Sequence, residues 1–171
     1  AINVTDGAGA KSHMSALATA AILAQNGIEP ILQFTTRDRN RIAIQGDLLG
    51  GWALDIPNIL CLYGDEVKGG DQPDTKEVRD LDTIGILRTA HEIKTKKMYP
   101  SGRKINDAPE FFIGGADTPF KINNDFDGLN LVKKIEAGVE FFQTQYVFEE
   151  DILKNYMQKL NDLNITDKAY F

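Results

Sequence analysis

Six short runs of apolar, β-branched and aromatic residues recur along the chain at a nearly constant spacing. Successive runs lie 28, 28, 53, 28 and 29 residues apart, and they begin near Ile2, Pro30, Asn58, Phe111, Val139 and Lys168. A strand, a helix of about three to four turns and the two loops around it need roughly this length. The spacing therefore predicts repeated βα units, and the 53-residue step is one such unit with insertions.

The stretches between these runs follow the helical period of about 3.6 residues. Ser12 is the expected N-cap of the first helix, which stops at Asn26-Gly27, and Asp80 or Asp82 opens the third. The expected helices cover residues 12–26, 39–54, 80–97 and 151–163. The second of them contains glycines, which weaken its helical signal.

Strands joined by helices imply a parallel sheet, because parallel neighbours need a crossover connection. The sheet is either a closed (β/α)8 barrel or an open, doubly wound sheet. A barrel takes about 250 residues, whereas this chain has 171, begins without Met in a strand pattern and ends on Tyr170-Phe171 in another. We therefore expect one α/β domain over residues 1–171, a TIM barrel segment of about six strands that is truncated at both ends.

Acidic residues outnumber basic ones, with 25 Asp and Glu against 19 Lys and Arg and a formal net charge of -6. This balance argues against a nucleic-acid-binding surface. The single cysteine, Cys61, and two distant histidines, His13 and His91, argue against a disulfide and a metal centre. No apolar run approaches the roughly 20 residues that span a bilayer, so we expect a cytoplasmic protein without a membrane segment.

Polar residues close the apolar runs, and the carboxyl ends of parallel strands are where α/β proteins place functional groups. Asp65 follows Gly64 at one such end, which predicts a carboxylate at the mouth of the barrel. Gln143 and Gln145 share one face of another strand. Because buried amides need partners, these two either face a ligand or satisfy nearby backbone groups.

Other polar residues fit structural roles. The glycine-rich turn over residues 6–12 lacks the glycines of a phosphate loop or a dinucleotide fingerprint, so it is interpreted as a mobile connecting loop. Lys133-Lys134 fits a solvated helix face, or local positive charge beside a phosphorylated cofactor. The remaining candidates fit ordinary loop positions (Asp6, Asp117), surface positions on helices (His13, His91) and a buried strand (Cys61).

Four blocks at successive strand ends carry a family resemblance. They are Asn3-Val4-Thr5-Asp6, residues 33–41 (QFTTRDRNR), residues 58–65 (NILCLYGD) and Gln143-Thr144-Gln145-Tyr146, with residues 132–138 (VKKIEAG) ahead of the last. In this order, and over essentially the whole chain, they resemble methylenetetrahydrofolate reductase. The second block is similar to the branch found in many anaerobes and in fusions with homocysteine methyltransferase.

The resemblance implies a (β/α)8 barrel with a bound flavin, either FAD or FMN. The implied reaction is the reduction of 5,10-methylenetetrahydrofolate to 5-methyltetrahydrofolate, a step of one-carbon metabolism and methionine biosynthesis. The resemblance further implies electrons from NAD(P)H or from an electron-transfer partner subunit, and an oligomeric protein. The family's proton donor is a glutamate on the first barrel strand, and no residue of this sequence precedes Ala1 to supply it.

The resemblance also implies which residues form the site, with Asp65 and Gln145 as the catalytic pair. Thr5, Gln33 and Thr35 would border the flavin, and Ala116 would line its site. Gly64 and Asp65 would lie beside the flavin ring and the pterin, and Gln145 would contact both flavin and folate. The ribityl, phosphate or adenosine end of the flavin would be reached by Asp127, Asn130, Lys133 and Lys134.

Two alternatives from other functional classes remain open. The first is a folate-binding methyltransferase barrel, which would use an aspartate and amides on a pterin without any flavin. The second is a non-catalytic subunit of a larger one-carbon or electron-transfer complex. Flavin absorbance in the purified protein separates the first alternative from the reductase.

Overall fold

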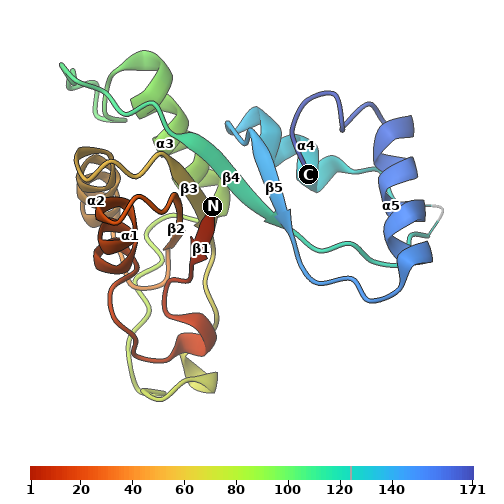
Figure 1. Ribbon diagram of the computed structural model, residues 1–171, viewed down its shortest axis with the longest axis horizontal. Helices are drawn as coiled ribbons and strands as arrows, with labels where there is room; N and C mark the ends of the chain where they lie inside the picture. Colours follow the sequence, from red (N-terminus) through yellow and green to blue (C-terminus); the bar gives the residue numbers. More distant parts are fainter. Residues whose placement is uncertain (124) are drawn as a thin grey trace.

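The computed structural model describes residues 1–123 and 125–171, and it has an α/β architecture (Figure 1). Within these residues, five strands form one parallel sheet. The strands are β1 (Ile2–Val4), β2 (Pro30–Thr35), β3 (Asn58–Leu62), β4 (Phe112–Asp117) and β5 (Phe141–Thr144). The helices are α1 (Ala16–Gln25), α2 (Arg41–Ala53), α3 (Thr83–Lys96), α4 (Leu129–Glu136) and α5 (Glu150–Asp162), with 3₁₀ turns η1 (Ala8–Ala10) and η2 (Val67–Gly69).

The strands pair in chain order, β1-β2-β3-β4-β5. An open doubly wound sheet reverses its strand order at a switch point, whereas consecutive strands of a (β/α)8 barrel do not. The order among the described strands is therefore that of a half-barrel. Figure 1 shows the sheet running from β1, β2 and β3 to β4 and β5, with α1 and α2 near the first strands and α4 and α5 near the last.

Alternation along the strands separates a helix-facing side from an inner side. Val4, Leu32, Phe34, Ile59 and Cys61 belong to the buried core that the sheet forms with its helices. The residues between them therefore point to the opposite, inner face, because successive side chains of a strand alternate. This alternation positions polar strand residues inside the half-barrel, away from the apolar core.

The expected sixth strand is reduced to a single contact. Tyr170 forms one parallel bridge with Phe141, supported by hydrogen bonds from Phe142 N to Tyr170 O (2.7 Å) and from Tyr170 N to Glu140 O (3.0 Å). The predicted sixth strand therefore lies beside β5, as expected. Within the described residues, however, it forms only a single bridge and not a full strand.

The first helix begins later than predicted, with Ser15 rather than Ser12 as its N-cap. The Ser12 N–H instead donates to both carboxylate oxygens of Asp71 (3.2 and 3.1 Å), which holds this segment in a loop. His13 therefore precedes the helix and does not lie in its first turn. At the other end, Gly27 has a positive φ of 73°, as a C-terminal glycine stop signal predicts.

The other expected helices are confirmed within three residues of their predicted bounds. Asp82 caps α3 by accepting from Gly85 N (2.7 Å), whereas Asp80 pairs with Arg41. Gly51 explains how the glycine-containing α2 fits the fold, because a β-carbon there would lie 3.4 Å from the Leu32 side chain. The helix thus packs closely on β2. Among the described residues, no helix has both the length and the apolar character that crossing a bilayer requires.

Candidate functional site

A polar cleft of about 440 Å³ lies at the carboxyl ends of the strands, on the inner face of the half-barrel. Seven of the residues that the resemblance assigns to the site line it: Thr5, Gln33, Thr35, Gly64, Asp65, Ala116 and Gln145. Asn3, Asp6 and Gln143 line it as well. Among the described residues, its walls carry carboxylates, amides and hydroxyls but no lysine or arginine. The cleft therefore suits an uncharged polar ligand better than an anion.

A second cleft, of about 490 Å³, contains three of the remaining assigned residues, Asp127, Asn130 and Lys134. It shares Ala116 with the first cleft, and the Lys134 ammonium donates to Ala116 O (2.5 Å). Burial lowers the pKa of Lys134. Lys133 is exposed and lines neither cleft. The assigned residues thus divide between two adjoining clefts rather than forming one group.

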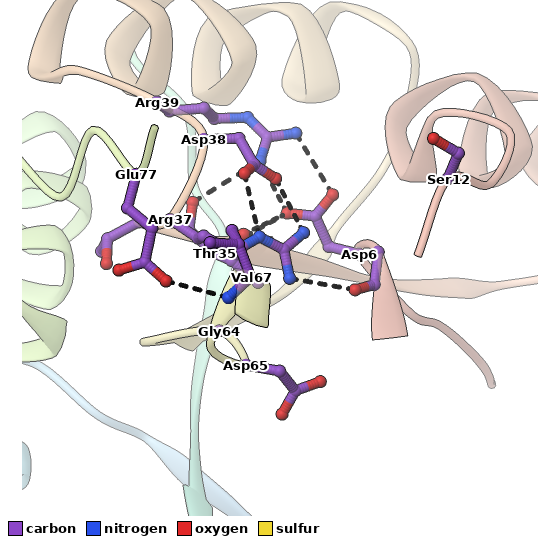
Figure 2. A network of polar contacts seen from close by, with 12 residues as sticks. Asp6, Ser12, Thr35, Arg37, Asp38, Arg39, Gly64, Asp65, Val67 and Glu77 are labelled. Atoms are coloured by element: carbon purple, nitrogen blue, oxygen red, sulfur yellow. Dashed lines mark hydrogen bonds and ion pairs between the residues drawn. The ribbon is translucent and has the colours of Figure 1, made fainter. Parts of the chain in front are cut away.

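Asp6 is the centre of a buried network and not the ordinary loop residue that the sequence suggested (Figure 2). Its Oδ2 accepts hydrogen bonds from Thr35 N (2.8 Å), Thr35 Oγ1 (3.0 Å) and Arg39 Nη1 (2.6 Å). Arg39 also donates to Asp47 (2.8 Å). This arrangement fixes the end of β2 against the end of β1, and it commits the Thr35 hydroxyl proton to Asp6.

Arg37 provides a second link between the same two strand ends. Its buried guanidinium donates twice to Asp38 (2.9 and 2.7 Å) and once to Gly7 O (3.1 Å). Hydrogen bonding from Arg37 lowers the pKa of Asp38. Such bidentate pairs are rigid as well as strong. The first loop of the barrel mouth is therefore held in place, which does not support its interpretation as a mobile connection.

Asp65 is exposed at the mouth of the first cleft, as the sequence predicted. Its Oδ2 accepts from Gly9 N (2.6 Å), so the carboxylate also contacts the β1–α1 loop. Arg79 fixes the local backbone by donating to the carbonyls of Tyr63 (2.9 Å), Gly64 (3.3 Å) and Asp65 (3.3 Å). Its guanidinium also stacks 3.8 Å above the Tyr63 ring.

Gly64 is required by the shape of this strand end. Its φ of +86° lies in the left-handed region, and a β-carbon there would lie 2.9 Å from Cβ of Thr35. A larger residue would push β2 and β3 apart at the cleft wall. The glycine therefore allows the backbone at Gly64 to approach Thr35 closely.

Asp117, at the end of β4, is buried rather than an ordinary loop residue. The Tyr156 hydroxyl lies 3.0 Å from both carboxylate oxygens of Asp117. Burial raises the pKa of both Asp117 and Tyr156. The pair joins α5 to the sheet beside the second cleft. Residue spacing gave no signal for it, because the two residues are 39 positions apart.

Two further predictions concern Cys61 and His91. Cys61 is fully buried, and burial raises the pKa of its thiol to about 12, so its interpretation as a core residue is confirmed. The expectation of an exposed His91 was wrong, since its side chain is half-buried and packs on Gly138. Gly138 leaves space there because it has no β-carbon.

The methylenetetrahydrofolate reductase family model matches residues 1–169 of this chain. The chain belongs to this family. A search of curated proteins found no matching sequence. Family membership confirms the resemblance, and it agrees with the parallel half-barrel, because members of the family are TIM barrels. It further supports an oxidoreductase in folate metabolism, in a family that generally depends on flavin.

Proposed function

We propose that this protein reduces 5,10-methylenetetrahydrofolate to 5-methyltetrahydrofolate with a bound flavin. Of the two flavins, FAD is the one we propose. The observation that carries the proposal is the gathering of Gln33, Gly64, Asp65 and Gln145 around one cleft at the carboxyl ends of the strands. Such a cleft is the usual place for the site of a barrel enzyme. NAD(P)H or an electron-transfer partner subunit would supply the electrons.

The residues present fit a flavin in chemical type. The first cleft offers neutral donors and acceptors, together with the close backbone approach at Gly64, for an uncharged planar ring. The second cleft offers Lys134 and Asn130 for the ribityl, phosphate or adenosine end. The two clefts share Ala116, so one extended ligand would span both. Bound flavin supplies the hydride chemistry, and the protein supplies binding and orientation.

Asp65 orients the substrate in this proposal. A carboxylate can accept paired hydrogen bonds from the amino and ring N–H groups of a pterin. Among the described residues, Gly9 N donates to Oδ2 and none donates to Oδ1, which leaves Oδ1 to accept from a ligand. Gln145, exposed in the wall of the same cleft, would contact both ligands through its carboxamide. Asp65 therefore contributes orientation and negative charge near the flavin.

The experiment is to compare the parent protein with Asp65→Asn. We expect folate affinity to fall roughly ten- to a hundredfold, about 1.5–3 kcal/mol, the scale of a hydrogen bond to a charged group. The flavin reduction potential should rise, because a nearby anion disfavours the anionic reduced ring. Glu66→Gln is the matched control. It also removes one negative charge, at the residue next to Asp65, but the Glu66 side chain lines neither cleft.

Each result has a distinct meaning. Parent protein that acquires no flavin absorbance yet binds tetrahydrofolate would contradict the reductase and favour a methyltransferase barrel. Parent protein that binds neither ligand would favour a non-catalytic subunit of a one-carbon or electron-transfer complex. Unchanged affinity and potential in Asp65→Asn would place Asp65 outside the chemistry and return it to an ordinary loop role.

A further inference from the structure

The floor of the first cleft contains a polar atom without a partner. Asn3, on β1, lines the cleft, and its Oδ1 is buried without a hydrogen-bond partner among the described residues. Native proteins pair nearly all such atoms, because an unpaired buried acceptor loses its hydration and gains nothing in return. An atom of this kind in a cleft wall therefore indicates a contact that a ligand completes.

A second amide lies diagonally across from Asn3 on the neighbouring strand. Asn3 pairs with Ile31 in the parallel register, so Gln33 lies two positions further along β2, on the same inner face. Gln33 lines the cleft and is only 8% exposed. No side-chain hydrogen bond joins it to another residue in the described part of the chain. A half-buried amide, Asn3, and a buried one, Gln33, thus lie on adjacent strands and keep hydrogen-bonding capacity toward the same cleft.

The helix-facing residues on these strands place Asn3 and Gln33 on the inner face of the sheet, outside the apolar core. Val4, Leu32 and Phe34 face the helices and form part of the apolar core. Asn3 and Gln33 alternate with them and face the interior of the half-barrel, where Leu60 also reaches the cleft floor. An apolar side chain would serve a purely structural purpose better at these positions.

We propose that Asn3 and Gln33 recognise the edge of an uncharged heterocycle that carries adjacent C=O and N–H groups. Each carboxamide offers an N–H donor and a C=O acceptor, which is the complement of such an edge. Rotation of the Asn3 carboxamide turns its oxygen or its nitrogen toward the ligand. Because no basic residue lines this cleft among those described, the pair does not suit a phosphate.

This inference rests on the proposed function and adds Asn3 as a specificity-determining residue. The pyrimidine edge of a flavin and the pterin ring of a folate share the required chemistry. The proposal assigns the pair to that shared edge, and the experiment distinguishes the two sources.

The experiment replaces Asn3 with leucine, which has nearly the same volume and no polar atoms. We measure dissociation constants for FAD, for FAD methylated at its ring N3, and for 5-methyltetrahydrofolate. The parent should bind FAD about tenfold more tightly than the methylated analogue, which has lost its N–H donor. Asn3→Leu should bind FAD about tenfold more weakly and should no longer discriminate between the two flavins. A loss of affinity confined to 5-methyltetrahydrofolate would instead identify the pterin as the ligand.

Asn58→Leu is the matched control. Asn58 lies on the same rung of the sheet as Asn3, through Ile31, but its Nδ2 already donates to Glu29 (2.7 Å) and to Pro30 O (3.2 Å). This control should lower stability and leave flavin discrimination unchanged. Asn3→Leu should leave the melting temperature of the ligand-free protein unchanged or raised, and Asn3→Ala repeats the binding test if leucine prevents folding.

Several outcomes would overturn the inference. They are unchanged affinity for all three ligands, retained discrimination in both Asn3 variants, and strong destabilisation of the ligand-free protein by both. A parent protein that binds no flavin and no folate would instead overturn the proposed function. The two failures are therefore distinguishable.

Discussion

The two halves of the barrel mouth are built in contrasting ways. At the ends of β1 and β2, carboxylates pair with arginines, as in Asp6 with Arg39 and Asp38 with Arg37. At the end of β4, Asp117 pairs with an uncharged partner, Tyr156, and the Tyr156 ring packs against Phe120 and Phe126. The first half is thus organised by ion pairs, and the second by aromatic packing around one carboxyl group.

This difference shows in the pKa values of the two halves. Pairing with arginine lowers the pKa of Asp38 and brings that of Glu77 to about 2, so these groups favour their charged forms. Burial raises the pKa of Asp117 and lowers that of Lys134, so burial opposes the charged form of each group. The first half is therefore electrostatically satisfied by itself, whereas the second gains most from a charged ligand near Lys134.

The strongest test of this contrast is Arg39→Ala. Removing the guanidinium leaves Asp6, whose side chain is 9% exposed, without its cation, and breaking a buried pair in this way costs about 3–5 kcal/mol. Urea unfolding measures the change in the free energy of unfolding. Arg41→Ala is the control, because the Arg41 side chain is 59% exposed where it pairs with Asp80, and its loss should be much smaller than that of Arg39→Ala. Equal losses in the two variants would refute a special role for the buried network.

A smaller loss is expected from Tyr156→Phe in the second half. The change keeps the aromatic packing and removes the hydroxyl that donates to Asp117, at a cost of about 1.5–3 kcal/mol. Thermal or urea unfolding measures it. Tyr170→Phe, at a side chain that is 75% exposed, should change stability by less than about 0.5 kcal/mol. If Tyr156→Phe left the free energy of unfolding unchanged, water would already solvate the Asp117 carboxyl group.

The smallest effect is a difference in pH dependence between Asp80→Asn and Asp117→Asn. Pairing with Arg41 lowers the pKa of Asp80 to about 2, so this carboxylate stabilises the fold above pH 3.8 and loses that contribution as the pH falls toward 2. Asp117 has a raised pKa, so the parent loses stability as the pH rises from 3.8 through the raised value.

The two substitutions should therefore change the stability difference from the parent in opposite directions. Asp80→Asn should become less stable relative to the parent as the pH rises from 2 to about 4. Asp117→Asn should become more stable relative to the parent as the pH rises above 3.8. Unfolding free energies measured across this range test both signs, and parallel curves for the two variants would contradict the contrast between the halves.

Periodicity and strand-end chemistry determined much of this molecule in advance. The near-constant spacing predicted the βα units, and the apolar run around Cys61 predicted that this residue is buried. The parallel arrangement predicted that polar residues gather where the strands end. These features follow from local rules, because the strand period, the helix period and crossover lengths act over a few residues to a few tens of residues. The family blocks also lie at these strand ends.

Only the tertiary structure decided which charges pair, where the first helix begins and how the clefts divide. Asp6 and Arg39 are 33 residues apart, and Asp117 and Tyr156 are 39 apart, so no local pattern joins them. The start of α1 likewise depends on Asp71, which draws Ser12 into a loop from 59 positions away. The unpartnered oxygen of Asn3 is equally invisible in the sequence. The physical reason is that burial and pairing depend on which strands become neighbours, and the sheet establishes this only after the chain has folded.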